Sequence, residues 1–416
     1  MTARVAPLRA LRYRSDRVGG LDMVLAPPYD VIGPEQAVQL RGRSPYNIVH
    51  ITNPVGDGPE RYERAARRLE SWVEDGVLAR AERPAFYVHR HHFVLGDQSF
   101  ARTGVWAALR LARYDEGIVL PHERTMKGPK ADRLALLRAC RAQLSPIFFI
   151  CSDAGARIAG FLGSLTEEEP TERAEFPAGQ THELWCVAER QRLDKLAGAL
   201  SEQVFLIADG HHRYETALAY RDELGAPGDV AAGGAAHDRL LAYIVPESDP
   251  GLLLLPTHRV IGGEPLDWSA ALDAASEFEI SRLTDVDNDS VRRALGEEAG
   301  RPAFVLVAGE EPGAWLMRLR KPDAVSGISS VALHDDFLSG CLRLSGEEQL
   351  DRISYVKEAS EALAAVRSGA VQAAALLAAP RVSQVCEAAA AGERLPAKTT
   401  YFWPKVPTGV AIVSHQ

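Results

Sequence analysis

Residues 204–220 have the sequence VFLIADGHHRYETALAY, which predicts a strand, a tight turn and a helix. The first five residues are uncharged and mostly β-preferring, as expected of a strand buried on both faces. Tyr214, Ala217 and Leu218 follow at helical spacing among good helix formers. Asp209 is expected to cap the helix, and Gly210 to permit the tight turn before it.

The first turn of this helix carries His211, His212 and Arg213. A helix N-terminus attracts anions, most often phosphate, through its N–H groups and its dipole. A polar corner that only caps the helix is the simpler alternative. Against it, two histidines and an arginine behind a buried strand cost desolvation energy unless a negative or hydrogen-bonding group meets them. We therefore predict that Gly210 and the three residues after it bind phosphate.

Other motifs recur along the chain at residues 26–32 (APPYDVI), 122–125 (HERT), 130–134 (KADRL), 145–148 (SPIF), 255–259 (LPTHR) and 396–405 (PAKTTYFWPK). Over essentially the whole chain they resemble a bacterial family known as domain of unknown function 1015. The DGHHR turn is also similar to the phosphate-contacting G-x-x-R turn of the ParB/sulfiredoxin-like superfamily, which includes CTP-binding partition proteins, sulfiredoxin and free-serine kinases. This second resemblance implies an α/β fold, with a ParB/sulfiredoxin-like nucleotide-binding core and a second α/β region.

The length of 416 residues is too great for one ordinary core, so two domains are expected. The composition changes after residue 248. This change places a phosphate- and nucleotide-binding domain at residues 1–248 and a C-terminal α/β domain at residues 249–416. The net charge of −9 argues against nucleic acid as a partner, although it leaves room for a local anion site.

The sequence favours a cytoplasmic protein without a membrane partner. Residues 1–17 lack the apolar core of a signal peptide, and the apolar run at residues 251–255 is too short to span a bilayer. The 5 cysteines lack C-x-x-C spacing, as expected of reduced structural thiols. The expected partners are a nucleotide and a small-molecule substrate, and a homodimer is one assembly that the sequence allows.

A second charged cluster contains His122, Glu123, Lys130 and Arg133. A solvated loop is the simpler interpretation. However, this mixture of side chains precedes an apolar strand at residues 146–150, and loops positioned by strands often carry reactive residues. We predict that Lys130 and Arg133 contact the cofactor.

The Gly128-Pro129 pair predicts a loop over residues 126–130, followed by a helix over residues 133–143. Both charged clusters adjoin apolar strands, and ligands of α/β proteins bind at such sheet edges. The segment from His122 to Arg133 is therefore predicted to lie within reach of the 209–214 turn.

Four residues in two further motifs are candidates for binding the substrate: Tyr29, Asp30, Lys398 and Thr399. Paired prolines shape the loop before Tyr29, and a rigid structural corner is an equally good interpretation of that loop. Lys405 reads as a surface charge.

A hairpin that turns at Gly96-Asp97 is predicted from two strand-like segments, residues 85–93 and 99–111. His89 and His91 share one face of its first strand, so a metal pair is one interpretation. We favour exposed strand histidines for these two and for His92.

Phosphoryl transfer needs cations and helix N-termini aimed at phosphate oxygens, and carboxylates for Mg²⁺ or for a hydroxyl proton. Asp209, Glu123 and His122 are the catalytic candidates, and Asp209 and Glu123 are also the predicted metal ligands. Walker A, protein-kinase, G-x-G-x-x-G and G-x-S-x-G motifs are all absent from the sequence.

The predicted function is phosphoryl transfer from ATP or ADP, with Mg²⁺, to a small hydroxyl metabolite. Free serine as acceptor rests only on the resemblance to serine kinases. The alternative is a non-catalytic or CTPase-type ParB-like regulator, because the same turn can bind a nucleotide without turning it over.

Overall fold

The computed structural model describes residues 4–123, 128–225, 236–284, 286–298, 301–309, 313–322 and 327–415, and it confirms the predicted α/β class. The chain forms two compact units. The first contains Met1–Pro121, Thr125–Leu252 and Pro404–Gln416, and the second contains His122–Arg124 and Leu253–Trp403. The sequence predicts one boundary between residues 248 and 249, whereas here the last segment of the chain belongs to the first unit.

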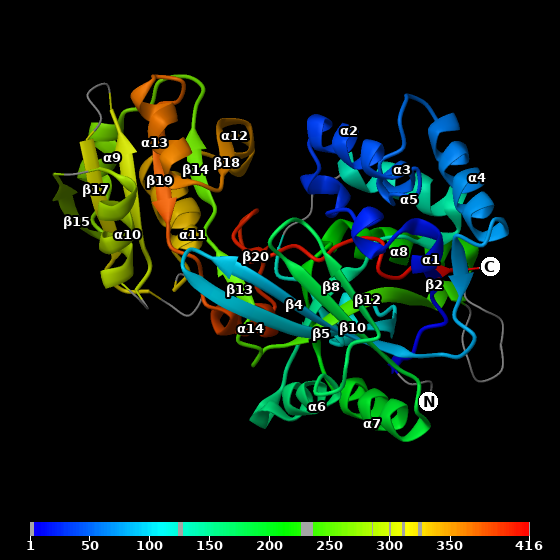
Figure 1. The fold of residues 1–416 in the computed structure, drawn as a ribbon. Coiled ribbons are helices and arrows are strands. Elements are labelled where there is room, and N and C mark those ends of the chain that lie inside the picture. Colours follow the sequence, from blue (N-terminus) through cyan, green and yellow to red (C-terminus); the bar gives the residue numbers. More distant parts are fainter. Residues whose placement is uncertain are drawn as a thin grey trace. The chain divides into compact units, whose positions relative to one another are not determined.

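A mixed sheet forms the centre of the first unit, with strand order β6–β11–β8–β12–β5–β4–β10–β9 and with β1 beside β5 (Figure 1). The pairs β11–β6 and β12–β8 are parallel, and the other pairs are antiparallel. Two short pairs, β2–β3 and β7–β21, complete this unit. The strands are β1 (Val5–Ala6), β2 (Leu11–Tyr13), β3 (Leu78–Arg80), β4 (Phe86–Leu95), β5 (Gln98–Arg110), β6 (Val119–Leu120), β7 (Ala142–Gln143), β8 (Ile147–Cys151), β9 (Glu172–Glu175), β10 (Thr181–Val187), β11 (Phe205–Asp209), β12 (Arg239–Pro246) and β21 (Val413–Ser414).

Helices pack against this sheet and against one another. Apolar side chains of α6 and α7 join alternate residues of the central strands in one buried cluster, while α8 packs on α5 and α5 on α4. None of the helices in the described ranges is long and apolar enough to cross a bilayer. The helices are α1 (Ser15–Val18), η1 (Leu21–Met23), η2 (Tyr29–Val31), α2 (Pro34–Arg43), α3 (Val49–Thr52), α4 (Glu60–Glu74), η3 (Tyr114–Glu116), α5 (Gly128–Cys140), η4 (Ala154–Ala156), α6 (Arg157–Leu165), α7 (Arg190–Ser201), α8 (His211–Leu224) and η5 (Ala236–Asp238).

The predicted strand–turn–helix is confirmed as β11, Gly210 and α8, and the predicted hairpin as β4 and β5. Gly210 has φ 99° and ψ 29°, a left-handed conformation that favours glycine. The prediction that Asp209 caps α8 is wrong, because Gly210 is the N-cap and no side chain caps this helix.

Two other local predictions are wrong. Helix α5 begins at Gly128 rather than Arg133, because proline is tolerated in the first turn of a helix, where its missing N–H is not needed. His89 and His91 are fully buried rather than exposed, since their strand face is covered; only His92 is partly exposed.

The second unit is built on a sheet with strand order β15–β17–β16–β19–β14–β18, in which the pairs are antiparallel. Alternate residues of β16 join two buried clusters, one shared with α9 and η6 and the other with α10 and α13, so helices cover both faces. A short pair, β13–β20, also belongs to this unit. Its elements are β13 (Leu253–Leu255), β14 (His258–Ile261), α9 (Trp268–Ala274), β15 (Phe278–Leu283), α10 (Asn288–Glu297), β16 (Ala303–Ala308), β17 (Gly313–Leu319), α11 (Ser329–Val331), η6 (Ala332–Cys341), α12 (Gly346–Arg352), β18 (Ile353–Val356), α13 (Ala359–Arg367), β19 (Ala373–Leu377), α14 (Val382–Ala390) and β20 (Tyr401–Trp403).

Candidate functional site

The turn between β11 and α8 is organised by the carboxylate of Asp209. Its Oδ2 accepts a hydrogen bond of 2.5 Å from Arg213, and its Oδ1 accepts one from the ammonium of Lys405. The Arg213 guanidinium also donates to the carbonyl of Pro146 and folds back across Gly210, where an added Cβ would lie 3.0 Å from it. Glycine therefore serves two needs here, since a side chain would crowd Arg213 as well as strain the backbone.

Two cations share this one carboxylate. Burial alone would raise the pKa of Asp209, but the charges of Lys405 and Arg213 outweigh burial and hold that pKa well below its ordinary value. Both oxygens already accept hydrogen bonds from cations. These contacts disfavour Asp209 as a general base, and its role as a metal ligand stays a prediction.

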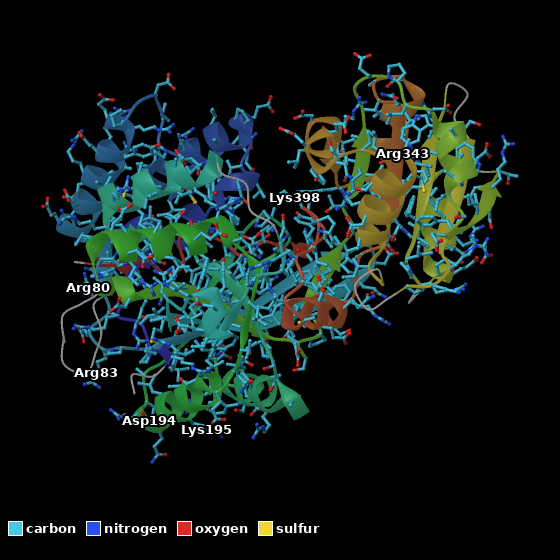
Figure 2. The ribbon with its side chains drawn as sticks, turned by 180° about the vertical axis from the view of Figure 1, so that it is seen from behind. Arg80, Arg83, Asp194, Lys195, Arg343 and Lys398 are labelled. Atoms are coloured by element: carbon cyan, nitrogen blue, oxygen red, sulfur yellow. The ribbon has the colours of Figure 1, made fainter. Side chains whose placement is uncertain are left out.

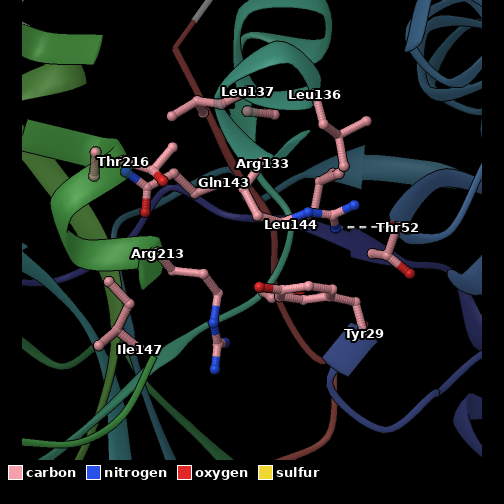
Figure 3. Close-up of a pocket in the computed structure, with 13 residues that line it drawn as sticks. Tyr29, Thr52, Arg133, Leu136, Leu137, Gln143, Leu144, Ile147, Arg213 and Thr216 are labelled. Carbon is pink, nitrogen blue, oxygen red and sulfur yellow. Dashed lines mark hydrogen bonds between the residues drawn. The ribbon is translucent and has the colours of Figure 1, made fainter. Parts of the chain in front are cut away.

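A pocket beside this turn is lined by Tyr29, Arg133 and Arg213, together with apolar side chains of α5 and α8 and of the segment between α5 and β8 (Figure 3). This open pocket offers about 60 Å³ of space to water-sized molecules. Thr52, at the end of α3, completes its rim.

Arg133 is held in this pocket by several partners. It stacks over the ring of Tyr29 at 4.0 Å, donates to the carbonyl of Thr52 at 2.8 Å and pairs with Asp132. Asp132 is shared in turn with Arg61, whose guanidinium lies 2.8 Å from Oδ1. Burial raises the pKa of the Tyr29 hydroxyl, which therefore stays protonated and able to donate.

The pocket thus has more cations than carboxylates around it. Arg213 shares one carboxylate with a lysine, and Arg133 shares another with a second arginine. In these two ion-pair groups four cations contact two carboxylates, in a chain whose net charge is −9. An anion is the ligand that this arrangement favours.

The other predicted site residues of the first unit lie around this pocket without lining it. Lys130 forms an ion pair with Glu215 of α8, which ties α5 to α8. His211 is buried and its charge contributes to the low pKa of Asp209, while His212 is partly exposed. Asp30 is exposed beside Tyr29. Among the residues that the structure describes, no group of three or more His, Cys, Asp or Glu side chains could hold a metal ion.

The remaining predicted residues form a cluster within the second unit. Oε1 of Glu123 accepts a hydrogen bond of 3.0 Å from the backbone N–H of Lys398, and His122 Nε2 lies 2.7 Å from the hydroxyl of Thr400. Thr399 bonds Ser330 at 2.8 Å. Lys398, labelled in Figure 2, is exposed. Its φ is positive, at 57°. Of the predicted His122–Arg133 segment, Lys130 and Arg133 therefore lie beside the 209–214 turn, His122 and Glu123 belong to the other unit, and residues 124–127 are outside the described ranges.

The interpretation of Lys405 as a surface charge is wrong, because its side chain is only 16% exposed and pairs with Asp209. Arg61 and Glu215 are two further candidates that the sequence did not single out. For Lys405 a signal existed, because it ends the PAKTTYFWPK motif. For the other two residues we find no signal in the sequence.

Residues 5–336 match the family model described as "Protein of unknown function (DUF1015)". The chain belongs to this family. Among curated proteins, none matches the DUF1015 chain.

Solved structures show only distant likeness to this DUF1015 protein. A conserved hypothetical protein from Pyrococcus furiosus is 16% identical, with 73% of this chain and 93% of that chain covered and a TM-score of 0.35. A free serine kinase in complex with AMP is 16% identical, with 74% and 91% covered and a TM-score of 0.36. SbnI with a C-terminal truncation, from Staphylococcus aureus, is 10% identical, with 72% and 84% covered and a TM-score of 0.33. The likeness to the ParB/sulfiredoxin-like superfamily stays a prediction from the DGHHR turn.

Proposed function

We propose that the pocket of the first unit binds the phosphates of ATP or ADP, and that the protein transfers a phosphoryl group to a small hydroxyl metabolite. The observation that carries this proposal is the excess of cations around the pocket, where Arg133 and Arg213 each share a carboxylate with another cation. Arginine forks suit phosphate oxygens because they donate in pairs.

The pocket also limits what it can hold. A space of about 60 Å³ is several times the space that one ordered water needs, which is enough for a phosphate group, and the pocket is open to solvent on one side. The ribose and base would therefore lie outside it, and the apolar side chains of α5 and α8 would line the inner wall.

Phosphoryl transfer depends on positioning and on charge stabilisation, which the cations of this pocket would supply. Mg²⁺ would arrive with the phosphates of the nucleotide, because Asp209 is committed to Lys405 and Arg213. The acceptor tested first is free serine, as implied by the resemblance of the DGHHR turn.

A nucleotide-binding regulator is the alternative, since the same charge excess would hold a nucleotide that is never turned over. The deciding experiment incubates the protein with ATP or ADP, Mg²⁺ and a pool of serine, threonine, homoserine and small sugars, and identifies products by mass. Nucleotide binding without any phosphorylated metabolite would support the regulator. Absence of nucleotide binding would refute both forms of the proposal.

Arg213→Ala is expected to weaken ADP binding by about 1.5–3 kcal/mol, the range for hydrogen bonds to a charged group. Calorimetry measures this loss, and circular dichroism checks the fold. Arg221→Ala is the matched control, because it removes an arginine of the same helix that bonds Leu111 and does not line the pocket. Equal affinities for the wild type and a folded Arg213→Ala would contradict the assignment.

Glu123→Gln is expected to keep nucleotide affinity and to lower turnover by at least ~100-fold if Glu123 is the general base. Glutamine retains an oxygen that can accept from the Lys398 N–H, so the 396–399 turn keeps its support. Product formation under single-turnover conditions is the measurement. Asp30→Asn is the comparison, and a loss confined to that variant would move the base to Asp30.

A further inference from the structure

Arg102 is a buried cation that forms no direct ion pair with a carboxylate among the described residues, although its charge acts on the nearby Asp249. It lies in β5, is completely buried, and its guanidinium stands over the rings of Phe148 at 5.0 Å and Tyr243 at 5.7 Å. In the described ranges no carboxylate oxygen approaches it within 4.0 Å. Moving a cation out of water is unfavourable, so a buried guanidinium depends on the specific contacts that hold it.

The surroundings of Arg102 offer few acceptors. Its Nε and Nη2 have no hydrogen-bond partner among the described residues, and neither do the neighbouring Trp106 Nε1 and Tyr243 Oη. Its Nη1 donates a hydrogen bond of 2.7 Å to the carbonyl of Pro404. The guanidinium is therefore committed to one backbone oxygen.

That oxygen belongs to the peptide group that also contains the nitrogen of Lys405. A peptide group is planar, and the proline ring fixes the φ of residue 404, so holding this carbonyl also fixes where the Lys405 side chain starts. From there the Lys405 ammonium reaches Asp209, which in turn binds Arg213. Arg102, Pro404, Lys405, Asp209 and Arg213 form a continuous series of contacts within the first unit.

We propose that Arg102 is a positioning residue of the phosphate pocket. By holding the Pro404–Lys405 peptide, it keeps the Lys405 ammonium on Asp209. The carboxylate is then shared by two cations, Lys405 and Arg213, and their group keeps one net positive charge. The inference rests on the proposed phosphate site and adds to it a residue that does not line the pocket.

The consequence for binding follows from the charge balance. If Lys405 leaves Asp209, the remaining pair Asp209–Arg213 is neutral, and this ion-pair group loses its excess positive charge. Removing one charge near a bound phosphate is expected to lower its affinity by about 10-fold at the effective dielectric of a partly buried site.

The test uses Arg102→Met, Lys405→Met and the double variant. Calorimetry with ADP should show about 10-fold weaker binding for each single variant. The double variant should bind no more weakly than either single variant, because both substitutions remove the same interaction. Additive losses, or an unchanged affinity of Lys405→Met, would overturn the inference.

A second measurement does not depend on nucleotide binding. Reductive methylation followed by mass spectrometry reports how readily Lys405 reacts, and its side chain is only 16% exposed in the ion pair. Lys405 should react several-fold faster in Arg102→Met than in the wild type, and Arg102→Lys should restore slow reaction by donating to Pro404. Unchanged labelling of Lys405 in the folded Arg102→Met would show that Arg102 does not position the Lys405 side chain. Failure of ADP to bind the wild type would refute only the proposed function.

Discussion

Asp209→Asn is expected to lower the free energy of unfolding by about 3–5 kcal/mol, the cost of removing one partner from a buried ion pair. Arg213 and Lys405 would then face each other without a carboxylate between them, while the side chains of all three residues are no more than 16% exposed. Urea unfolding near pH 7.5 measures the loss. Stability equal to that of the wild type would show that the carboxylate does not hold these cations together.

The matched control is Glu215→Gln, which removes the carboxylate partner of Lys130. That pair is more exposed, at 32% and 23%, so the expected loss is at most about 1 kcal/mol. Added inorganic phosphate provides a further comparison, because an anion bound between Arg213 and Lys405 would restore part of the stability that Asp209→Asn loses. Phosphate should stabilise Asp209→Asn more than Glu215→Gln.

The sequence predicted those parts of the site that are encoded by residues close together in the chain. Strand β11, the turn and helix α8 followed from a buried run, a glycine and helical spacing within 17 residues. The position of Arg133 beside the turn was also predicted, since its segment adjoins the strand β8 that pairs with β11.

Partners distant in sequence could not be predicted in the same way. The prediction that Asp209 caps the helix rests on its local position, whereas Lys405, which binds its carboxylate, lies 196 positions later in the sequence. The same is true of Arg61, which reaches Asp132 from 71 positions away. Side-chain charge and local spacing do not encode such pairings, so the cation excess appears only in the folded chain.

The predicted exposure of the strand histidines was also wrong. The alternation of side chains along the strand predicts that His89 and His91 share one face of β4. It does not predict whether that face is exposed to solvent or covered by another layer. In the structure His89 Nε2 lies 2.9 Å from His182 Nδ1, and the rings of His91 and His182 stack with centroids 4.0 Å apart. These three histidines are almost fully buried.

Acid is expected to destabilise the protein through this histidine cluster. Burial, helped by neighbouring charges, puts the pKa of His89 and of His91 well below the ordinary value, and burial lowers the pKa of His182 to about 4. The folded state therefore favours the neutral rings. The stability that they contribute is complete above the unfolded pKa of about 6.5 and is lost as the pH falls from there toward 4.

Each of these histidines should contribute a slope of up to about 1.4 kcal/mol per pH unit within that window. Urea unfolding of the wild type at several pH values between 7.5 and 4.5 measures the combined slope. His182→Asn removes one titrating ring, so its stability should fall less steeply with decreasing pH. His92→Asn is the control, because His92 lies on the same strand, is 44% exposed and pairs with Glu183, and replacing it should not flatten the slope. A wild type equally stable at both ends of the range would contradict the burial of neutral histidines, since protonation would then cost the folded state nothing.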